Sequence, residues 1–144
     1  MSIPGLRRGD ARVGGIVFFG RMLDKIRLQA AGRLPPGYNL GASVPTFFDA
    51  RCCRFLQVDY DALARRTLHG GADEEILAWC FEHGRRPTAE EIEIWNDFMI
   101  KRGLRDDSSA RLQQAKEKLG LGGRADIQTW FELHRADENR DPGP

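Results

Sequence analysis

The sequence predicts an all-α fold, a single compact bundle of six or seven short helices with a Gly/Pro-rich loop after the first helix. Helix start and stop signals recur about every fifteen residues, whereas the alternation of apolar and polar residues that marks strands is scarce. A chain of 144 residues with 41% hydrophobic and 30% charged residues has the size and balance of one globular domain. Because each helix is short, we expect burial against neighbouring helices to hold it.

Glycine and proline mark the first helix and the loop after it. We expect a helix over residues 19–31 that begins near Gly20, because a glycine inside a helix costs about 1 kcal/mol. Gly32 then ends it in a left-handed conformation. The proline- and glycine-rich residues 33–45 form the loop, and Thr46 opens a second helix over 46–56 with Asp49 in the style of a capping box.

Capping residues mark the remaining helices. The clearest is 88–103, in which Thr88 and Glu91 form a capping box and Gly103 ends the helix. The other four are expected over residues 59–69, 73–84, 109–119 and 126–135, beginning at Asp59, Asp73, Ser109 and Asp126.

The two ends of the chain differ from the rest in composition. Residues 1–13 carry three arginines, and we expect them to form a flexible basic leader. Residues 14–136 form the single helical domain, and the polar residues 137–144, with two prolines, form a disordered tail.

Composition and charge exclude several classes of protein. No apolar run approaches the roughly 18 residues that a membrane span needs, and no apolar signal-peptide core is present. Three cysteines cannot form a disulfide framework, so we expect a cytoplasmic protein. A net charge of +1 argues against a nucleic-acid partner, because such proteins usually carry a larger positive excess.

Metal and cofactor motifs are not found in the sequence. His69, His83 and His134 are far apart, and Cys80 with His83 would supply only two ligands. The glycine spacing at 15–22 is that of a phosphate-binding loop, but an arginine and a methionine stand where that loop needs Lys and Ser/Thr. We therefore expect neither a metal nor a cofactor.

One polar cluster on the first helix has two interpretations. Arg21, Asp24 and Lys25 share a helix face, which is typical of a solvated stripe. The same residues could form an anion site, in which Arg21 grips a carboxylate or phosphate, Asp24 orients its guanidinium, and Lys25 is a second cation or a proton donor. Tyr38, in the loop, would then cover a pocket or anchor the loop itself.

A second candidate pair lies in the middle of the 88–103 helix. Trp95 falls on an apolar face and is most simply a core residue. Asn96 is an indifferent helix former, so a specific hydrogen bond is expected there.

Several stretches resemble a bacterial family named Domain of Unknown Function 5069. They are the run from Gly14 to Gly32, residues 47–63, E-I-E-I-W-N at 91–96 and T-W-F-E at 129–132, so the likeness extends over about 14–140. The resemblance implies a small, helical, soluble bacterial protein and no particular activity. Its characteristic residues are Arg21, Asp24, Lys25, Tyr38, Trp95 and Asn96. The sequence departs from the family pattern in two places: Gly20 stands where the family typically has a proline, and residues 41–45 stand where it has an Asn-Cys-Pro-Leu-Asp loop.

Two functional hypotheses follow. The first is a protein that binds a small anionic metabolite, either without catalysis or as a cofactor-independent isomerase, lyase or cyclase. In it Arg21 binds the anion, Asp24 orients it, Lys25 or Tyr38 handles protons, and Trp95 and Asn96 contact the ligand. The second is a non-catalytic interaction module, or a homo-oligomer, because residues 1–37 are strongly basic and 38–100 are acidic. An enclosed cavity beside Arg21 would favour the first hypothesis.

Overall fold

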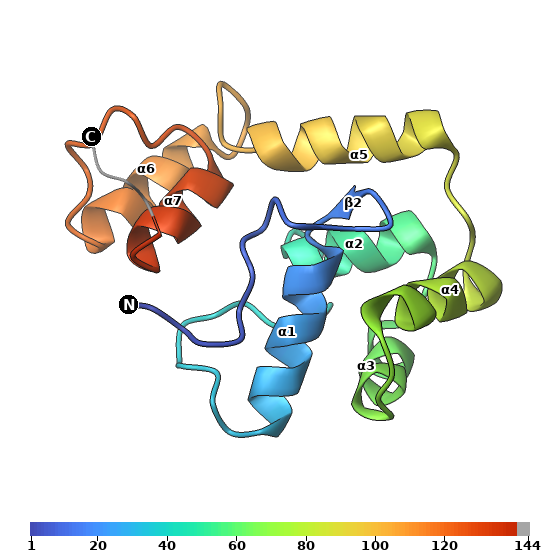
Figure 1. The fold of residues 1–144 in the computed structure, drawn as a ribbon. Helices are drawn as coiled ribbons and strands as arrows, with labels where there is room; N and C mark the ends of the chain where they lie inside the picture. Colours follow the sequence, from blue (N-terminus) through green and yellow to red (C-terminus); the bar gives the residue numbers. More distant parts are fainter. Residues whose placement is uncertain (141–144) are drawn as a thin grey trace.

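The computed structural model describes residues 1–140, in which seven helices and one small hairpin are found (Figure 1). In chain order these are β1 (Arg12–Val13), β2 (Ile16–Val17), α1 (Phe19–Ala30), α2 (Phe48–Leu56), α3 (Tyr60–Leu68), α4 (Asp73–His83), α5 (Ala89–Lys101), α6 (Ser109–Lys118) and α7 (Trp130–Asp137). The predicted helical fold is confirmed. No helix among these is long and apolar enough to cross a membrane.

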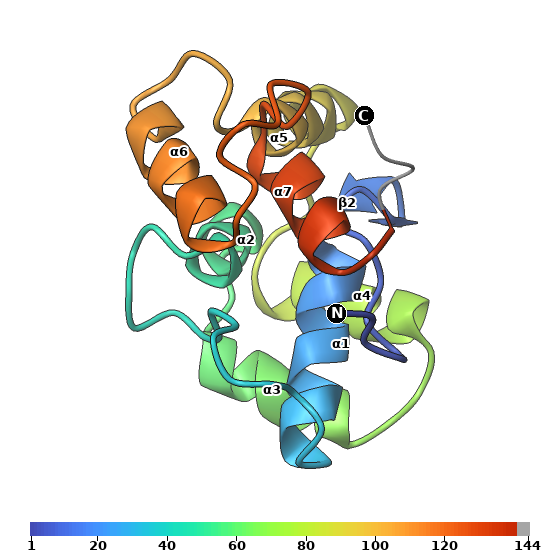
Figure 2. The same cartoon turned by 90° about the vertical axis from the view of Figure 1, so that its left-hand side faces the viewer.

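Helix α1 is the centre of the molecule. Figures 1 and 2 show α3 and α4 on one side of it, α6 and α7 on the other, and α5 across the hairpin end. Nine of its twelve residues are buried, and they include Arg21, Asp24 and Lys25 as well as the apolar side chains. The predicted solvated stripe is therefore wrong, because the charged face of α1 is covered by other parts of the chain.

The β-hairpin between residues 12 and 17 is fastened to α5. Gly14 and Gly15 make the turn with positive φ angles of 57° and 81°, which glycine adopts without strain. The Asn96 side chain accepts a hydrogen bond from the Val17 N–H at 3.0 Å and donates one to the Gly15 carbonyl at 2.8 Å. Trp95 Nε1 donates to the Val17 carbonyl at 3.1 Å. The expected specific hydrogen bond of Asn96 thus serves the hairpin.

Two predicted helix starts and one predicted capping residue are corrected. Helix α2 begins at Phe48, and Asp49 completes no capping box, because its carboxylate accepts the N–H of Gly41 at 2.8 Å. Helix α4 begins with Asp73 as its first residue rather than its cap. Helix α7 is capped by Thr129 instead of Asp126.

Both ends of the described chain pack against the domain. Ile3 and Leu6 of the predicted flexible leader are buried in a cluster with Leu28, because their apolar side chains cover this end of α1. The predicted tail begins too early, since α7 runs to Asp137 and Glu138 is buried. Residues 141–144 of that predicted tail lie outside the described residues.

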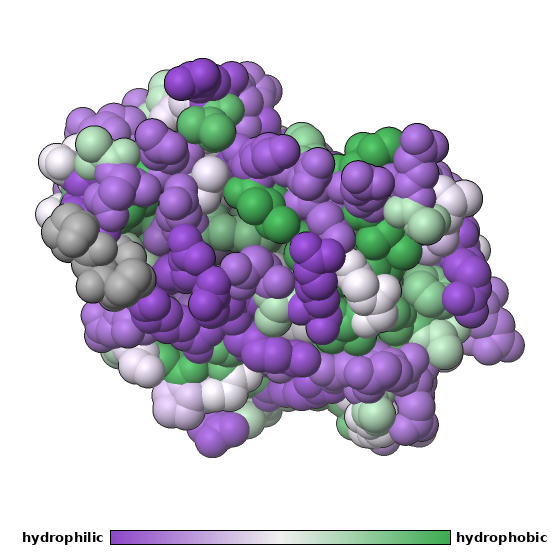
Figure 3. Space-filling model, turned by 45° about the horizontal axis from the view of Figure 1, so that its top comes forward, coloured by the Kyte–Doolittle hydropathy of each residue, from purple (hydrophilic) through white to green (hydrophobic). Residues whose placement is uncertain are grey.

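Exposed apolar side chains are scattered. On the face shown in Figure 3 they form separate groups between hydrophilic residues. Ile94 and Phe98 of α5 are among the larger exposed apolar residues. These two residues are four apart and share one face of α5, where Arg51 and Arg102 lie over the Phe98 ring.

Candidate functional site

A cavity of about 690 Å³ lies between α1 and the C-terminal helices α6 and α7. Its walls also include the loop at 35–39, the start of α2 at 46–48 and Arg102 after α5. Residues of α6 and α7 form a hydrophobic cluster of their own around Leu112 and Leu133, separate from the main core. The cavity therefore lies where these two helices meet the rest of the domain, and its volume is that of a small-molecule site.

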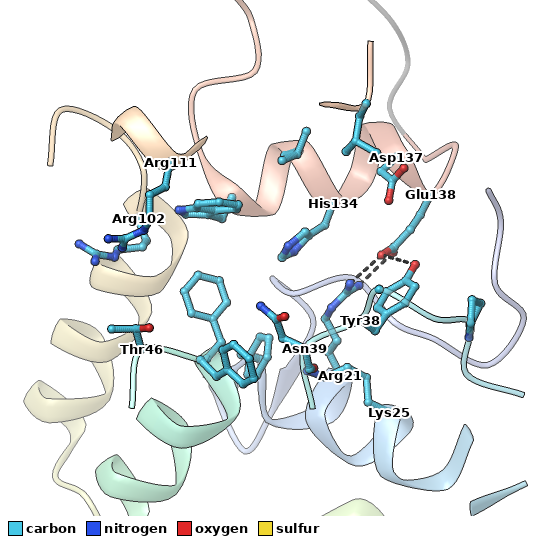
Figure 4. Close-up of a pocket in the computed structure, with 18 of the residues that line it drawn as sticks. Arg21, Lys25, Tyr38, Asn39, Thr46, Arg102, Arg111, His134, Asp137 and Glu138 are labelled. Atoms are coloured by element: carbon cyan, nitrogen blue, oxygen red, sulfur yellow. Dashed lines mark hydrogen bonds and ion pairs between the residues drawn. The ribbon is translucent and has the colours of Figure 1, made fainter. Parts of the chain in front are cut away.

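One end of the cavity is built from Arg21, Glu138 and Tyr38 (Figure 4). Arg21 donates two hydrogen bonds to the Glu138 carboxylate, at 2.9 and 2.6 Å, and both side chains are nearly inaccessible to solvent. The Tyr38 hydroxyl donates to the same carboxylate at 3.1 Å. Burial and the charge of Glu138 raise the pKa of Tyr38, so this hydroxyl stays protonated and acts as a donor.

Lys25 lies next to this group and is also paired. Its Nζ lies 2.7 Å from Asp49 Oδ1 and donates to the Asn39 carbonyl at 2.7 Å. Burial lowers the pKa of Lys25, and the Asp49 carboxylate opposes this effect. Burial likewise raises the pKa of Asp49, and Lys25 opposes that shift. Lys25 and Arg21 are thus cavity residues whose charges are already balanced within the chain.

The other three predicted site residues do not line the cavity. Asp24 accepts hydrogen bonds from Arg7 at 2.8 and 3.0 Å instead of orienting Arg21. Trp95 and Asn96 hold the hairpin, as described above. Of the six predicted residues, the structure brings Arg21, Lys25 and Tyr38 together at the cavity.

His134 projects from α7 between the two ends of the cavity (Figure 4). Its ring lies among aromatic rings, with centroid distances of 6.4 Å to Phe48 and 6.5 Å to Trp130. Burial, then the charges of Arg21 and Lys25, lower the pKa of His134 well below 6.5. The imidazole is therefore neutral at pH 7, and its Nδ1 has no hydrogen-bond partner within the described residues.

The opposite end of the cavity is cationic. Arg102 and Arg111 both line it, and Figure 4 shows them at the end away from Glu138. Arg102 lies 2.6 Å from an Asp107 carboxylate oxygen. The Arg111 side chain makes no hydrogen bond or ion pair with any residue from 1 to 140. A free guanidinium at a cavity wall can bind an anion.

Sequence reasoning missed His134, Glu138 and Arg111. A usable signal was the spacing of four residues that puts Trp130, His134 and Glu138 on one face of a helix. The expected end of the helix at Arg135 concealed it.

The described residues hold no cluster of three or more His, Cys, Asp or Glu side chains able to bind a metal. Cys52, Cys53 and Cys80 are buried, and burial raises the pKa of each thiol. These thiols are therefore poor nucleophiles.

The fold and the cavity define a small, mainly helical protein with a cavity that combines aromatic rings and cationic side chains. The chain belongs to the family described as domain of unknown function (DUF5069), whose model matches residues 4–140. This match contains every helix of the structure. A search of curated proteins finds no match.

Proposed function

We propose that the protein binds a small organic anion in the cavity between α1 and the α6–α7 pair. The observation that carries this proposal is the charge of the lining. Four cationic side chains and two carboxylates line the cavity; three of the cations are paired with carboxylates, whereas the Arg111 side chain has no ion pair within residues 1–140. At the wall of a partly enclosed space an unpaired guanidinium attracts anions more strongly than it would on an open surface. The four cations are Arg21, Lys25, Arg102 and Arg111, and the carboxylates are those of Asp137 and Glu138.

The rest of the lining favours a ligand with an apolar or flat body. Phe18, Phe47, Phe48 and Trp130 line the cavity. Aromatic rings supply large contact areas and accept stacked or edge-on partners. A ligand with an aliphatic or aromatic body and one anionic group fits this lining better than a bare inorganic ion.

The two ends of the cavity have different parts in this proposal. Because Arg21 and Lys25 are already paired, their end supplies hydrogen bonds without net charge. The anionic group of the ligand lies at the opposite end, against Arg102 and Arg111. The anion contact is therefore assigned to Arg102 and Arg111, whereas the sequence predicted it at Arg21 on α1.

His134 gives the cavity a group suited to proton transfer. A neutral imidazole at pH 7 can accept a proton from a bound ligand, which a cofactor-independent isomerase, lyase or cyclase requires. We therefore assign the role of proton acceptor to His134, in place of Lys25 and Tyr38, in any reaction of this kind in bacterial metabolism.

Thermal unfolding in the presence of small aromatic and aliphatic carboxylates and phosphates tests the proposal. A bound compound at 100 times its Kd should stabilise the protein by about 2.7 kcal/mol. Arg111→Ala should weaken binding at least tenfold without loss of stability, because Arg111 is exposed and unpaired within residues 1–140. Arg65→Ala, an exposed arginine of α3 outside the cavity, makes the same charge change as a control. Equal effects of the two substitutions, or no stabilising compound, would contradict the proposal.

The alternative of an interaction module has less support. The apolar groups on the face in Figure 3 are separated by hydrophilic side chains. Some charges of the basic N-terminal segment and the acidic middle also neutralise one another within the chain, because Asp73 pairs with Arg7 and Arg27 at 2.6 Å each.

A further inference from the structure

Arg51 of α2 lies near two arginines that line the α5–α6 end of the cavity, Arg102 and Arg111. The guanidinium carbons of Arg51 and Arg102 lie 5.4 and 5.5 Å from the centroid of the Phe98 ring. Arg111 and Arg102 line the same end of the cavity. We call Arg51, Arg102 and Arg111 the arginine cluster.

The arginine cluster lacks enough carboxylates to neutralise it. Arg102 pairs with Asp107 at 2.6 Å and with Asp106 at 3.3 Å, and the Asp107 side chain is 82% exposed. The side chains of Arg51 and Arg111 make no hydrogen bond or ion pair within residues 1–140. The Nε of Arg51 is buried and has no partner there. A buried donor without a partner and like charges at close range both destabilise the protein.

The electrostatic surroundings of Arg51 agree with this geometry. Burial, followed by the charges of Arg102 and Arg54, lowers the pKa of Arg51, and Asp107 opposes the shift only in part. An anion bound in the cluster would offset the repulsion between the arginines and would accept a hydrogen bond from the Arg51 Nε.

The number and shape of the donors favour phosphate over carboxylate. A guanidinium presents a planar fork of N–H donors, and one carboxylate is satisfied by one such fork. A phosphate group carries a larger charge and presents tetrahedrally arranged oxygens, so it can accept hydrogen bonds from several forks at once.

We propose that the arginine cluster binds the phosphoryl group of a phosphorylated small molecule whose organic part lies in the cavity toward Trp130 and His134. This inference rests on the proposed function, because Arg102 and Arg111 belong to the cavity. It names the anionic group and adds Arg51, which the cavity lining does not include.

Three probes at constant ionic strength test the ligand class: inorganic phosphate, phenyl phosphate and phenylacetate. Calorimetric titration should detect both phosphates, with phenyl phosphate at least tenfold tighter than inorganic phosphate because its ring enters the cavity. Phenylacetate should bind at least tenfold more weakly than phenyl phosphate. If phenylacetate binds as tightly as phenyl phosphate and inorganic phosphate does not bind, the phosphoryl assignment fails while the proposed function stands. If none of the probes binds, the phosphoryl assignment also fails.

Arg51→Met distinguishes a binding role from a structural one. This variant keeps the aliphatic stem and removes the charge and the unpaired Nε, so without anion its melting temperature should equal or exceed that of the parent. Its affinity for inorganic phosphate should fall at least tenfold. Arg65→Met on α3 is the matched control and should change neither quantity. A lower melting temperature together with unchanged phosphate affinity would show that Arg51 is structural and would overturn the proposal.

Discussion

His134 is the cavity residue whose lowered pKa makes the stability of the protein depend on pH. Burial and two nearby cations hold the imidazole neutral in the folded protein, whereas an unfolded histidine titrates near 6.5. Below that pH the unfolded chain binds a proton that the folded protein does not. Above about pH 6.5 His134 therefore does not reduce the free energy of unfolding. As the pH falls from 6.5 toward the lowered pKa of the folded state, this free energy decreases.

A pH series of unfolding free energies measures this effect. Between pH 6.5 and 5, His134 should cost the protein up to about 1.4 kcal/mol per pH unit. His134→Asn should lose less stability over this range than the parent, by about 1–2 kcal/mol in total. Urea denaturation at pH 5, 6 and 7 gives the comparison. His83→Asn, at an exposed position outside the cavity, controls for loss of an imidazole, and equal pH slopes of the parent and His134→Asn would refute the prediction.

The candidate site could be predicted in part. Arg21 and Lys25 were found because charged residues at helical spacing identify a common face, and both line the cavity. The same spacing could not show which charges have partners far along the chain. Glu138 lies 117 residues from Arg21 in sequence, and only the fold brings them together.

Among the elements, helices whose caps are local were predicted best. The Thr88–Glu91 capping box forms as expected, and Asp59 accepts the Ala62 N–H at 2.9 Å. The start of α2 was missed because Asp49 is used in tertiary contacts with Lys25 and Gly41. The hairpin was missed because each strand has two residues and is held by Asn96 rather than by a pattern of its own.

The capping box of Thr88 and Glu91 should contribute measurably to the stability of α5. Thr88→Ala should destabilise the protein by about 1 kcal/mol, because it removes the acceptor for the Glu91 N–H at 3.1 Å. Thr46→Ala is the matched control, since Thr46 is exposed and caps no helix. Urea denaturation followed by circular dichroism measures both, and a loss of stability in Thr46→Ala equal to that in Thr88→Ala would contradict the assignment of the caps.

Across the whole molecule, the ion pairs of α1 connect distant segments. Its charged residues bind partners from the N-terminal segment, α2, α4 and the residue after α7. The two ends of the described chain also meet, because Arg140 donates to the Leu6 carbonyl and the Met1 amino group donates to the Asp137 carbonyl. Much of the contrast between the basic N-terminal segment and the acidic middle is thus internal compensation, which a charge count along the sequence cannot reveal.

The Arg21–Glu138 pair closes the cavity and ties the C-terminal helix to the centre, so its removal should act on the whole fold. Glu138→Leu leaves the Arg21 guanidinium buried without a carboxylate and should cost about 3–5 kcal/mol. Arg21→Met leaves Glu138 uncompensated, with a similar cost. The double variant removes both charges and should be less destabilised than the sum of the two, by about 2 kcal/mol or more. Urea unfolding of the four proteins gives this coupling energy, with Asp137→Asn as a control at a neighbouring cavity carboxylate. Additive single effects would mean that the pair does not connect α7 to α1.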